Sequence, residues 1–462
     1  MGENNNIKEI IAAYEALYNN KYTAILDEKS YIQLIEHYSA RDQWEMVLSV
    51  AQTGIEQFLY SIEFYLAKAE ALIALRKFSE AEEVLSKAKN LAPSETEIQM
   101  LEAQILMEQH RLQDASVLIE ELKQKDLFQH QSELLLLEAQ LYQRQEQYEG
   151  MFYLLSYALR EDPNHQDLLD RFGICIEITK RYKESVVIHQ EILDRDPYAY
   201  MAWYNLGNAQ AYLGNYPEAI DAYEFAFAIQ EDFKIAIKSC ADLCFELQLF
   251  HKSKKYYHEL LDLQHSDADT FLRLGQNYLY LEDYATARTF LTKAIQFDFQ
   301  NDEAYYNIGQ TYFAEENWKA AIKYFEKAIY IEDSQEDYFL SLALALGELD
   351  QIEEAEEQFL TALEIAPEHN GIWIEYALFL LHQSRGEDAG ELLEGALEFA
   401  EDSSLLYCRV ACFFAMGNRQ AGFYWLSDAL EEDFENYPLL FHYLPELQND
   451  GTILGLISSY LP

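Results

Sequence analysis

The stretch YMAWYNLGNAQAYLGNYPEAIDAYEFAFAIQEDF, residues 200–233, decides the fold of this chain of 462 residues. Trp203 and Gly207 lie four residues apart in its first half, which is the spacing of one buried helical face. Gly214 interrupts this helix. Pro217 suits the first turn of a second helix, where its missing N–H costs no intrahelical hydrogen bond. The stretch therefore predicts a helix–turn–helix pair.

The pattern of this pair returns along almost the whole chain. Small residues follow one another every 34 positions, with a single step of 36, in the series Ala69, Ala103, Ala139, Gly173, Gly207, Ala241, Gly275, Gly309, Ala343, Ala377 and Ala411. Prolines fall 24 residues after four of these, at Pro93, Pro163, Pro197 and Pro367. A fixed period of about 20–50 residues is typical of stacked repeats, in which each unit contacts its neighbours. The sequence therefore predicts one all-α solenoid of about twelve units.

The same register gives the domain organisation. Units start at residues 28, 62, 96, 132, 166, 200, 234, 268, 302, 336, 370 and 404. They span residues 28–436, and we expect residues 1–27 and 437–462 to cap the two ends with one helix each, over 6–18 and 437–461. No linker rich in Gly, Ser or Pro interrupts the array, so we expect one continuous solenoid.

These units resemble the tetratricopeptide repeat (TPR). The resemblance is carried by Trp203, Leu206, Gly207, Ala219, Tyr223 and Ala226, by Phe271, Leu274, Gly275, Tyr278, Ala287 and Ala294, and by Tyr305, Ile308, Gly309, Tyr312, Ala321, Phe325 and Ala328. It implies a right-handed all-α solenoid of stacked helix pairs. It also implies a concave groove, lined by the first helix of each pair, that holds extended peptides.

The chain is strongly acidic. Asp and Glu number 81 against 33 Lys and Arg, which gives a net charge of −48, and residues 336–462 hold 25 acids against three arginines. Such a field repels phosphates and anionic lipids, so we expect neither nucleic acid nor membrane as a partner. The acidic excess favours either the solubility of a long array or the attraction of a basic partner to the C-terminal third. The sequence leaves both interpretations open.

Sequence signals of location and catalysis are missing. No run of about 18 apolar residues could span a bilayer, and the start MGENNN lacks the regions of a secretory signal, so we expect a cytoplasmic protein. We find no phosphate-binding Gly-rich loop, no HExxH and no GxSxG motif. The chain also ends about one helix after its last unit, which leaves no room for a catalytic domain. We therefore expect no enzyme activity, no catalytic residues and no cofactor.

Two cysteine pairs have the spacing of a possible metal site. Cys240 and Cys244, and likewise Cys408 and Cys412, lie four residues apart and could present two thiols on one helical face. Both pairs are better explained as small hydrophobes at buried positions. We therefore expect no metal site.

The expected binding site lies on the first helix of each unit, on the face opposite its buried side. If the first residue of a unit is position 1, this face comprises positions 2, 5, 6, 9 and 13, which we call the groove stripe. In the central units the stripe is rich in Asn and Gln, which can both donate to and accept from a peptide backbone. We expect these amides to face the open groove. The predicted peptide-binding residues are Arg171, Tyr204, Asn205, Asn208, Arg273, Gln276, Tyr306, Asn307 and Gln310.

The two ends of the groove stripe are apolar. They carry Leu66, Met100, Leu101, Leu136 and Leu137 near the N-terminus, and Leu340, Leu344, Ile374, Leu378 and Met416 near the C-terminus. Either neighbouring first helices bury these side chains, or a hydrophobic partner or a second copy covers them.

The predicted function is that of a non-enzymatic scaffold or adaptor for protein–protein interaction, which binds a peptide or protein segment in its groove. Two alternatives stay open: a subunit of a secretion or envelope assembly complex, and a regulatory peptide sensor. The sequence specifies neither the partner nor the oligomeric state.

Overall fold

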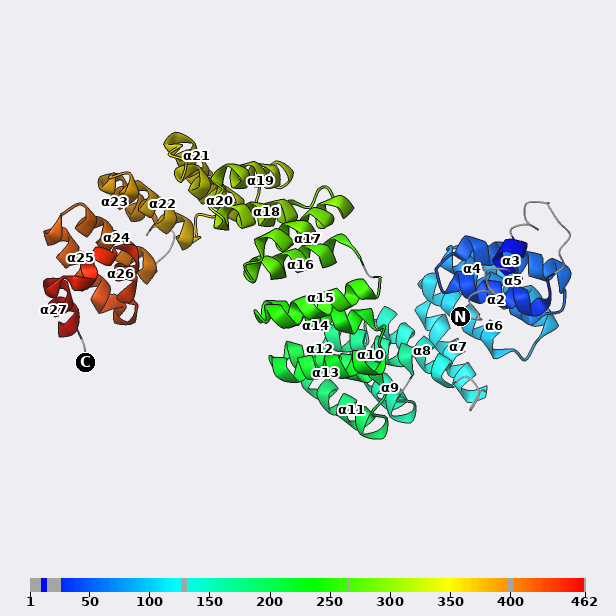
Figure 1. The fold of residues 1–462 in the computed structure, drawn as a ribbon. Coiled ribbons are helices and arrows are strands. Elements are labelled where there is room, and N and C mark those ends of the chain that lie inside the picture. Colours follow the sequence, from blue (N-terminus) through cyan, green and yellow to red (C-terminus); the bar gives the residue numbers. More distant parts are fainter. Residues whose placement is uncertain are drawn as a thin grey trace. The chain divides into compact units, whose positions relative to one another are not determined.

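The computed structural model describes residues 10–14, 26–125, 131–163, 165–264, 266–396 and 402–460. Every regular element among these residues is a helix, and none of those helices is both long and apolar enough to cross a bilayer. The predicted all-α class is confirmed (Figure 1). The chain divides into two compact units, Met1–Phe233 and Lys234–Pro462, which we call the first and the second unit. Their boundary coincides with a predicted repeat boundary.

The first unit consists of consecutive helix pairs. Its first helices are α2 (Glu28–Ser39), α4 (Ile62–Ala74), α6 (Thr96–Glu108), α8 (Gln131–Arg144), α10 (Gln166–Thr179) and α12 (Tyr200–Tyr212). Its second helices are α3 (Trp44–Gln57), α5 (Phe78–Leu91), α7 (Leu112–Lys125), α9 (Tyr148–Glu161), α11 (Tyr182–Arg195) and α13 (Tyr216–Ile229).

The second unit continues the same order and ends in short helices. Its first helices are α14 (Lys234–Glu246), α16 (Ala268–Tyr280), α18 (Asp302–Ala314), α20 (Glu336–Gly347), α22 (Asn370–His382) and α24 (Ser403–Ala415). Its second helices are α15 (Phe250–Asp262), α17 (Tyr284–Phe297), α19 (Trp318–Ile331), α21 (Ile352–Ile365), α23 (Gly386–Ala396) and α25 (Arg419–Glu432). The terminal elements are η1 (Phe434–Asn436), α26 (Pro438–Tyr443), η2 (Pro445–Asn449) and α27 (Gly451–Ser459). In both compact units, the first helix of each repeat begins at the predicted repeat start or one residue before it.

The small residues of the repeat lie where the two helices of a pair meet. A Cβ atom built on Gly207 would come 2.6 Å from the Tyr223 ring and 3.2 Å from the carbonyl oxygen of Ala219. A Cβ atom on Gly275 would come 2.5 Å from Cγ of Leu291. Because no real Cβ atom tolerates such distances, these glycines permit the close approach of the helices. The register predicted from the sequence is therefore the packing register.

A left-handed residue ends the first helix of each pair. After α4, Arg76 N–H donates to the carbonyl of Ile73 (2.9 Å) and Lys77 N–H donates to the carbonyl of Leu72 (2.8 Å). These two hydrogen bonds form a Schellman motif. This motif needs a left-handed residue at Arg76 (φ 58°). The equivalent left-handed residues are Asp42, His110, Glu146, Lys180, Gly214, Gln248, Glu282, Glu316, Asp350, Ser384 and Gly417. Only two of them are glycine.

The two ends of the array differ from the simple caps that the sequence predicts. Of the predicted N-terminal helix, residues 10–14 are helical, with Tyr14 packed edge-on against Tyr31 at 6.2 Å, and the rest lies outside the described residues. The prediction of one C-terminal helix over 437–461 is wrong, because α26 and α27 are separate. Pro445 begins η2 between them, and the Asp450 side chain caps α27 by accepting from Thr452 N–H (2.9 Å).

The side chains at the apolar ends of the groove stripe are buried or half-buried inside the chain. Leu66 and Leu101 are 7% and 6% exposed and belong to one core cluster between successive pairs. Ile374 is 8% exposed in the cluster that joins α20, α22 and α24. Neighbouring first helices therefore account for these side chains. The five cysteines are likewise buried, which confirms the prediction for Cys240, Cys244, Cys408 and Cys412.

Candidate functional site

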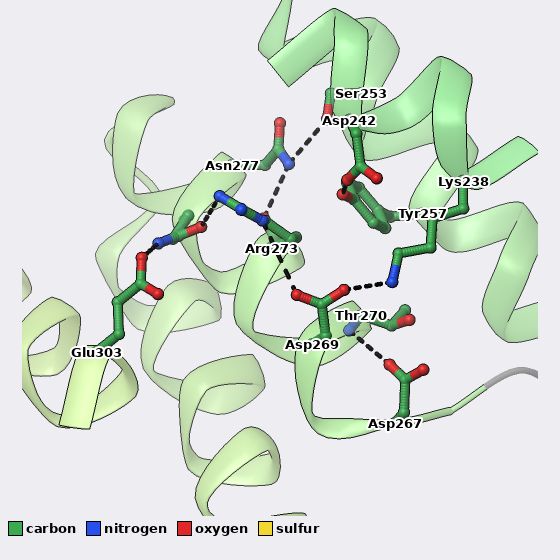
Figure 2. A network of polar contacts seen from close by, with 11 residues as sticks. Lys238, Asp242, Ser253, Tyr257, Asp267, Asp269, Thr270, Arg273, Asn277 and Glu303 are labelled. Carbon is green, nitrogen blue, oxygen red and sulfur yellow. Dashed lines mark hydrogen bonds and ion pairs between the residues drawn. The ribbon is translucent and has the colours of Figure 1, made fainter. Parts of the chain in front are cut away.

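In the second unit, the groove stripe carries a chain of polar contacts that runs across three first helices (Figure 2). Lys238 Nζ on α14 lies 2.5 Å from an Asp269 carboxylate oxygen on α16, and the other oxygen of Asp269 lies 4.0 Å from Arg273 Nε. Arg273 donates to Gln276 Oε1 (3.2 Å), and Gln276 donates to Glu303 Oε1 on α18 (2.6 Å). Each charge on this path therefore already has a partner.

Side branches of this network are also satisfied internally. The Tyr257 hydroxyl donates to Asp242, and Asn277 donates to the Ser253 hydroxyl (3.0 Å) (Figure 2). Burial raises the pKa of Asp242, while the hydrogen bond from Tyr257 opposes that rise. Burial lowers the pKa of Lys238, but the hydrogen bond to Asp269 and the negative charges of Asp269 and Asp242 together leave this pKa raised. The network thus holds the repeats together, and Arg273 and Gln276, predicted to bind peptide, are part of it.

The remaining predicted residues of the second unit are engaged with their neighbours. Gln310 donates to the Ser341 hydroxyl (2.8 Å), and the Tyr306 hydroxyl lies 3.2 Å from the same oxygen. The Tyr306 ring stacks against Tyr338 at 4.6 Å, and burial raises the pKa of Tyr306. Asn307 is 6% exposed and donates to the carbonyl of Glu303 in its own helix (2.7 Å).

Asn205, in the first unit, is buried in the same way. It is 5% exposed, and its Nδ2 donates to the carbonyl of Leu169 on the preceding first helix (2.8 Å). A Cβ atom on Gly173 would lie 3.0 Å from the Asn205 oxygen, so position 6 packs against the small residue of the preceding repeat. The expectation that Asn205 and Asn307 face the open groove is therefore wrong, because position 6 lies where first helices contact one another.

Tyr204 and Asn208 lie on α12, the same helix as Asn205. Asn208 accepts a hydrogen bond from the Tyr223 hydroxyl (2.8 Å), and the Tyr204 ring packs between Tyr223 at 5.9 Å and Phe233 at 5.4 Å. Both side chains are half-buried. They support the helix pair from 200 to 233, which leaves little of either for a ligand.

The first unit contains a cavity of about 670 Å³ across four first helices. Its lining is Ile73, Gln104, Met107, Glu108, Gln140, Gln143, Arg144, Tyr148 and Arg171. These residues come from α4, α6, α8 and α10 and from the start of α9. Arg171, the one predicted site residue among them, lies at the α10 end.

Two glutamines of this cavity offer free hydrogen-bonding groups. Gln104 and Gln140 both occupy position 9, on successive first helices, and both are half-buried. Neither carboxamide has a hydrogen-bond partner among the residues that the structure describes. A half-buried amide without a partner keeps its hydrogen-bonding capacity for a ligand or water. This pair is therefore the feature of the groove stripe best suited to binding.

The cationic groups of the cavity differ in their pairing. Arg144 forms an ion pair with Glu108, whereas Arg171 donates a hydrogen bond to Gln143 Oε1 (2.9 Å). Within the described part of the chain, no carboxylate lies within ion-pair distance of Arg171. Arg171 thus lines the cavity with a guanidinium group that forms no ion pair among the described residues.

Sequence reasoning missed Gln104 and Gln140, although a signal was present. They occupy the same position 9 as Asn208, Gln276 and Gln310, which were selected. The leucines at positions 5 and 6 made the N-terminal units look apolar. Leu66, Leu101 and Leu137 are buried between helices, so the side chains at position 9 contribute much of the polar lining of the groove there.

One group of possible metal ligands occurs among the described residues, in the second unit. Glu336, Asp337 and His369 place ligand atoms within 4.8 Å of one another, and His369 Nδ1 lies 3.7 Å from Glu336. These side chains are half-buried or exposed, and the contact is that of a surface ion pair when His369 is protonated. It does not by itself define a metal centre.

The sequence matches the family to which its repeats point. Models of the tetratricopeptide repeat match residues 62–95, 200–233, 268–301, 302–334 and 340–404. The chain is therefore a tetratricopeptide-repeat protein, and repeats of this family are scaffolds for binding proteins and peptides. No curated protein matches the chain in sequence.

Solved structures with the same kind of repeat are similar to this chain at low identity. YrrB, described as a TPR protein with an unusual peptide-binding site, is 17% identical, with 43% of this chain and 97% of that chain covered and a TM-score of 0.35. The APC/C hetero-tetramer Cut9–Hcn1 is 13% identical, with 86% of this chain and 97% of that chain covered and a TM-score of 0.38. The type IV pilus biogenesis factor PilW is 18% identical, with 44% of this chain and 93% of that chain covered and a TM-score of 0.38. Scores this low carry no information about function.

Proposed function

We propose that this protein is a scaffold that holds an extended peptide segment of another protein in the groove of its first unit. The observation that carries the proposal is the pair of unpartnered carboxamides, Gln104 and Gln140, on successive first helices of one cavity. The segment would lie across α4, α6, α8 and α10.

The chemistry of the two glutamines suits a peptide main chain. A carboxamide has two N–H donors and an acceptor oxygen, and an extended peptide exposes both N–H and C=O groups along each edge. Recognition of this kind depends little on the side chains of the ligand. Among the described residues of the second unit, Lys238, Arg273 and Gln276 of the groove stripe are already paired, so binding there would first break existing hydrogen bonds and ion pairs.

Selection of displayed random 12-residue peptides on the full chain tests the proposal. Enriched peptides are then titrated against the wild-type protein and the double variant Gln104→Ala, Gln140→Ala by fluorescence anisotropy. We expect the double variant to weaken binding about 5- to 100-fold, because each lost hydrogen bond contributes about 0.5–1.5 kcal/mol.

The matched control is Gln190→Ala, which removes an exposed glutamine from the second helix α11. It should leave the dissociation constant unchanged. If enriched peptides bind the double variant as tightly as the wild type, they do not occupy this cavity and the proposal fails.

A further inference from the structure

His189 occupies position 24 of its repeat, where other repeats pack a ring or a leucine against the glycine at position 8. In those repeats, the atom nearest to a Cβ built on the glycine lies at 2.4–2.6 Å and belongs to position 24: Tyr223 for Gly207, Leu291 for Gly275 and Phe325 for Gly309. For Gly173, the glycine of the His189 repeat, the three nearest atoms all belong to Asn205 of the next repeat. His189 therefore leaves room beside Gly173.

A small cavity of about 10 Å³ lies at this place. Its walls come from α10, α11 and α12, all in the first unit, and include Gly173, Tyr182, His189 and Asn205. A cavity needs about 10–15 Å³ to hold one water molecule. This cavity is therefore at the lower limit for one water molecule and too small for a larger ligand.

Two polar atoms of the lining residues are buried and have no hydrogen-bond partner among the described residues: Nε2 of His189 and the hydroxyl of Tyr182. Nδ1 of His189 lies 2.8 Å from the carbonyl oxygen of Ser185, which can only accept, so Nδ1 carries the ring proton. Burial lowers the pKa of His189 to about 4, which keeps the ring neutral at neutral pH. Nε2 therefore presents a lone pair that needs a donor, and leaving it unmet would cost its full desolvation penalty.

The next two repeats show what meets a polar group at position 24. Tyr223 donates to Asn208, and Tyr257 donates to Asp242, in each case at position 9 of the repeat's own first helix. In the repeat from 166, position 9 is Ile174, whose side chain has no polar group. Position 24 of this repeat therefore needs another partner.

We propose that the cavity is a binding site for one water molecule, which joins α11 to α12. The water would donate one hydrogen to Nε2 of His189, accept from the Tyr182 hydroxyl and donate its second hydrogen to Oδ1 of Asn205. The amide nitrogen of Asn205 already donates to the carbonyl of Leu169 (2.8 Å), which turns Oδ1 toward Gly173. Three hydrogen bonds are typical of a buried water molecule. This inference does not depend on the proposed function.

Tyr182→Phe tests the site by the sign of its effect on the melting temperature of the full chain. If a water molecule bridges the hydroxyl, the variant loses a buried hydrogen bond, and the melting temperature should fall by about 2–4 °C. If the hydroxyl has no partner, its removal relieves an unmet buried group, and the melting temperature stays or rises. That second result would overturn the proposal.

Tyr216→Phe is the matched control. Tyr216 occupies position 17 of the next repeat, as Tyr182 does in its own, but it is exposed. Loss of its hydroxyl should leave the melting temperature unchanged.

The same change in a His189→Phe background shows whether the hydroxyl acts through His189. A phenylalanine at position 24 fills the space beside the glycine, as Phe325 does beside Gly309, and removes Nε2. Tyr182→Phe should then no longer lower the melting temperature, because the bridge is already lost. An equal decrease in both backgrounds would contradict the bridge.

A crystal structure of the full chain tests the site without any variant. We expect an electron-density peak at about 2.7–3.2 Å from both Nε2 of His189 and the Tyr182 hydroxyl oxygen. A direct hydrogen bond between these two groups, or a cavity without a peak, would show that the proposal is wrong.

Discussion

Gly207 offers the sharpest test of the packing register. A Cβ atom at this position would lie 2.6 Å from the Tyr223 ring, whereas ordinary contacts begin at about 3.4 Å, so the ring would have to retreat by about 0.8 Å. The ring is 4% exposed, and its hydroxyl is held by Asn208 at 2.8 Å. The Ala219 carbonyl, at 3.2 Å, blocks a shift in the other direction. The substitution therefore cannot be absorbed by one flexible side chain.

For Gly207→Ala we expect a net loss of about 1–2 kcal/mol in the free energy of unfolding. Overpacking of a tight contact costs about 1–3 kcal/mol, and the higher helix propensity of Ala returns at most about 1 kcal/mol. For a unit of this size, the melting temperature should fall by about 2–8 °C. The assay is thermal unfolding of the full chain followed by circular dichroism at 222 nm.

Gly390→Ala is the matched control. Gly390 also lies within a helix, α23, but nothing lies within 4 Å of a Cβ atom built there. Only the propensity gain remains, so its melting temperature should rise by about 1–4 °C. If both variants shift in the same direction, the helix contacts assigned to the small-residue register are wrong.

Three further predictions follow from the buried side chains and the turns. Asn205→Ala should lower the free energy of unfolding by about 1 kcal/mol in urea denaturation, because it deletes the hydrogen bond to the carbonyl of Leu169. An unchanged midpoint would contradict the role of Asn205 in joining successive repeats. Burial lowers the pKa of His189 to about 4 from its ordinary 6.5, so the unfolded chain binds a proton at higher pH than the folded chain does. Stability should therefore fall as pH drops from about 6.5 to 4, and His189→Phe should flatten this pH dependence of the urea midpoint. Glu282→Gly should raise the free energy of unfolding by about 0.5–1 kcal/mol, because Glu282 is held at φ 62° in the turn, and a destabilised variant would show that its side chain matters more than its backbone strain.

The helix pairs and their register were predictable from the sequence because they depend on local spacing. Gly207 and Tyr223 face each other because helical pitch and turn length bring their positions together. The role of Asn205 was not predictable in this way. A period of 34 residues fixes which side chains share a face of one helix, but the angle between successive first helices decides whether position 6 meets solvent or a neighbour. The division after Phe233 also leaves no mark in composition.

The candidate site was predictable only in part, for a related reason. Arg171 was identified because it stands out as a polar residue on the groove stripe. Gln104 and Gln140 share that stripe, but the leucines beside them made their units look hydrophobic. Burial of Leu101 and Leu137 between first helices is a property of the stack and not of any single repeat.

The network from Lys238 to Glu303 also constrains how the second unit can change its sequence. Two of its contacts join residues about one repeat apart, Lys238 with Asp269 and Gln276 with Glu303. Loss of one member of such a pair therefore leaves the other with an unmet charge or hydrogen bond. Neutral drift in this stripe should proceed by paired exchanges about 27 to 31 positions apart. Gln104 and Gln140 of the first unit have no such partner among the described residues, so each could be exchanged without a compensating change elsewhere.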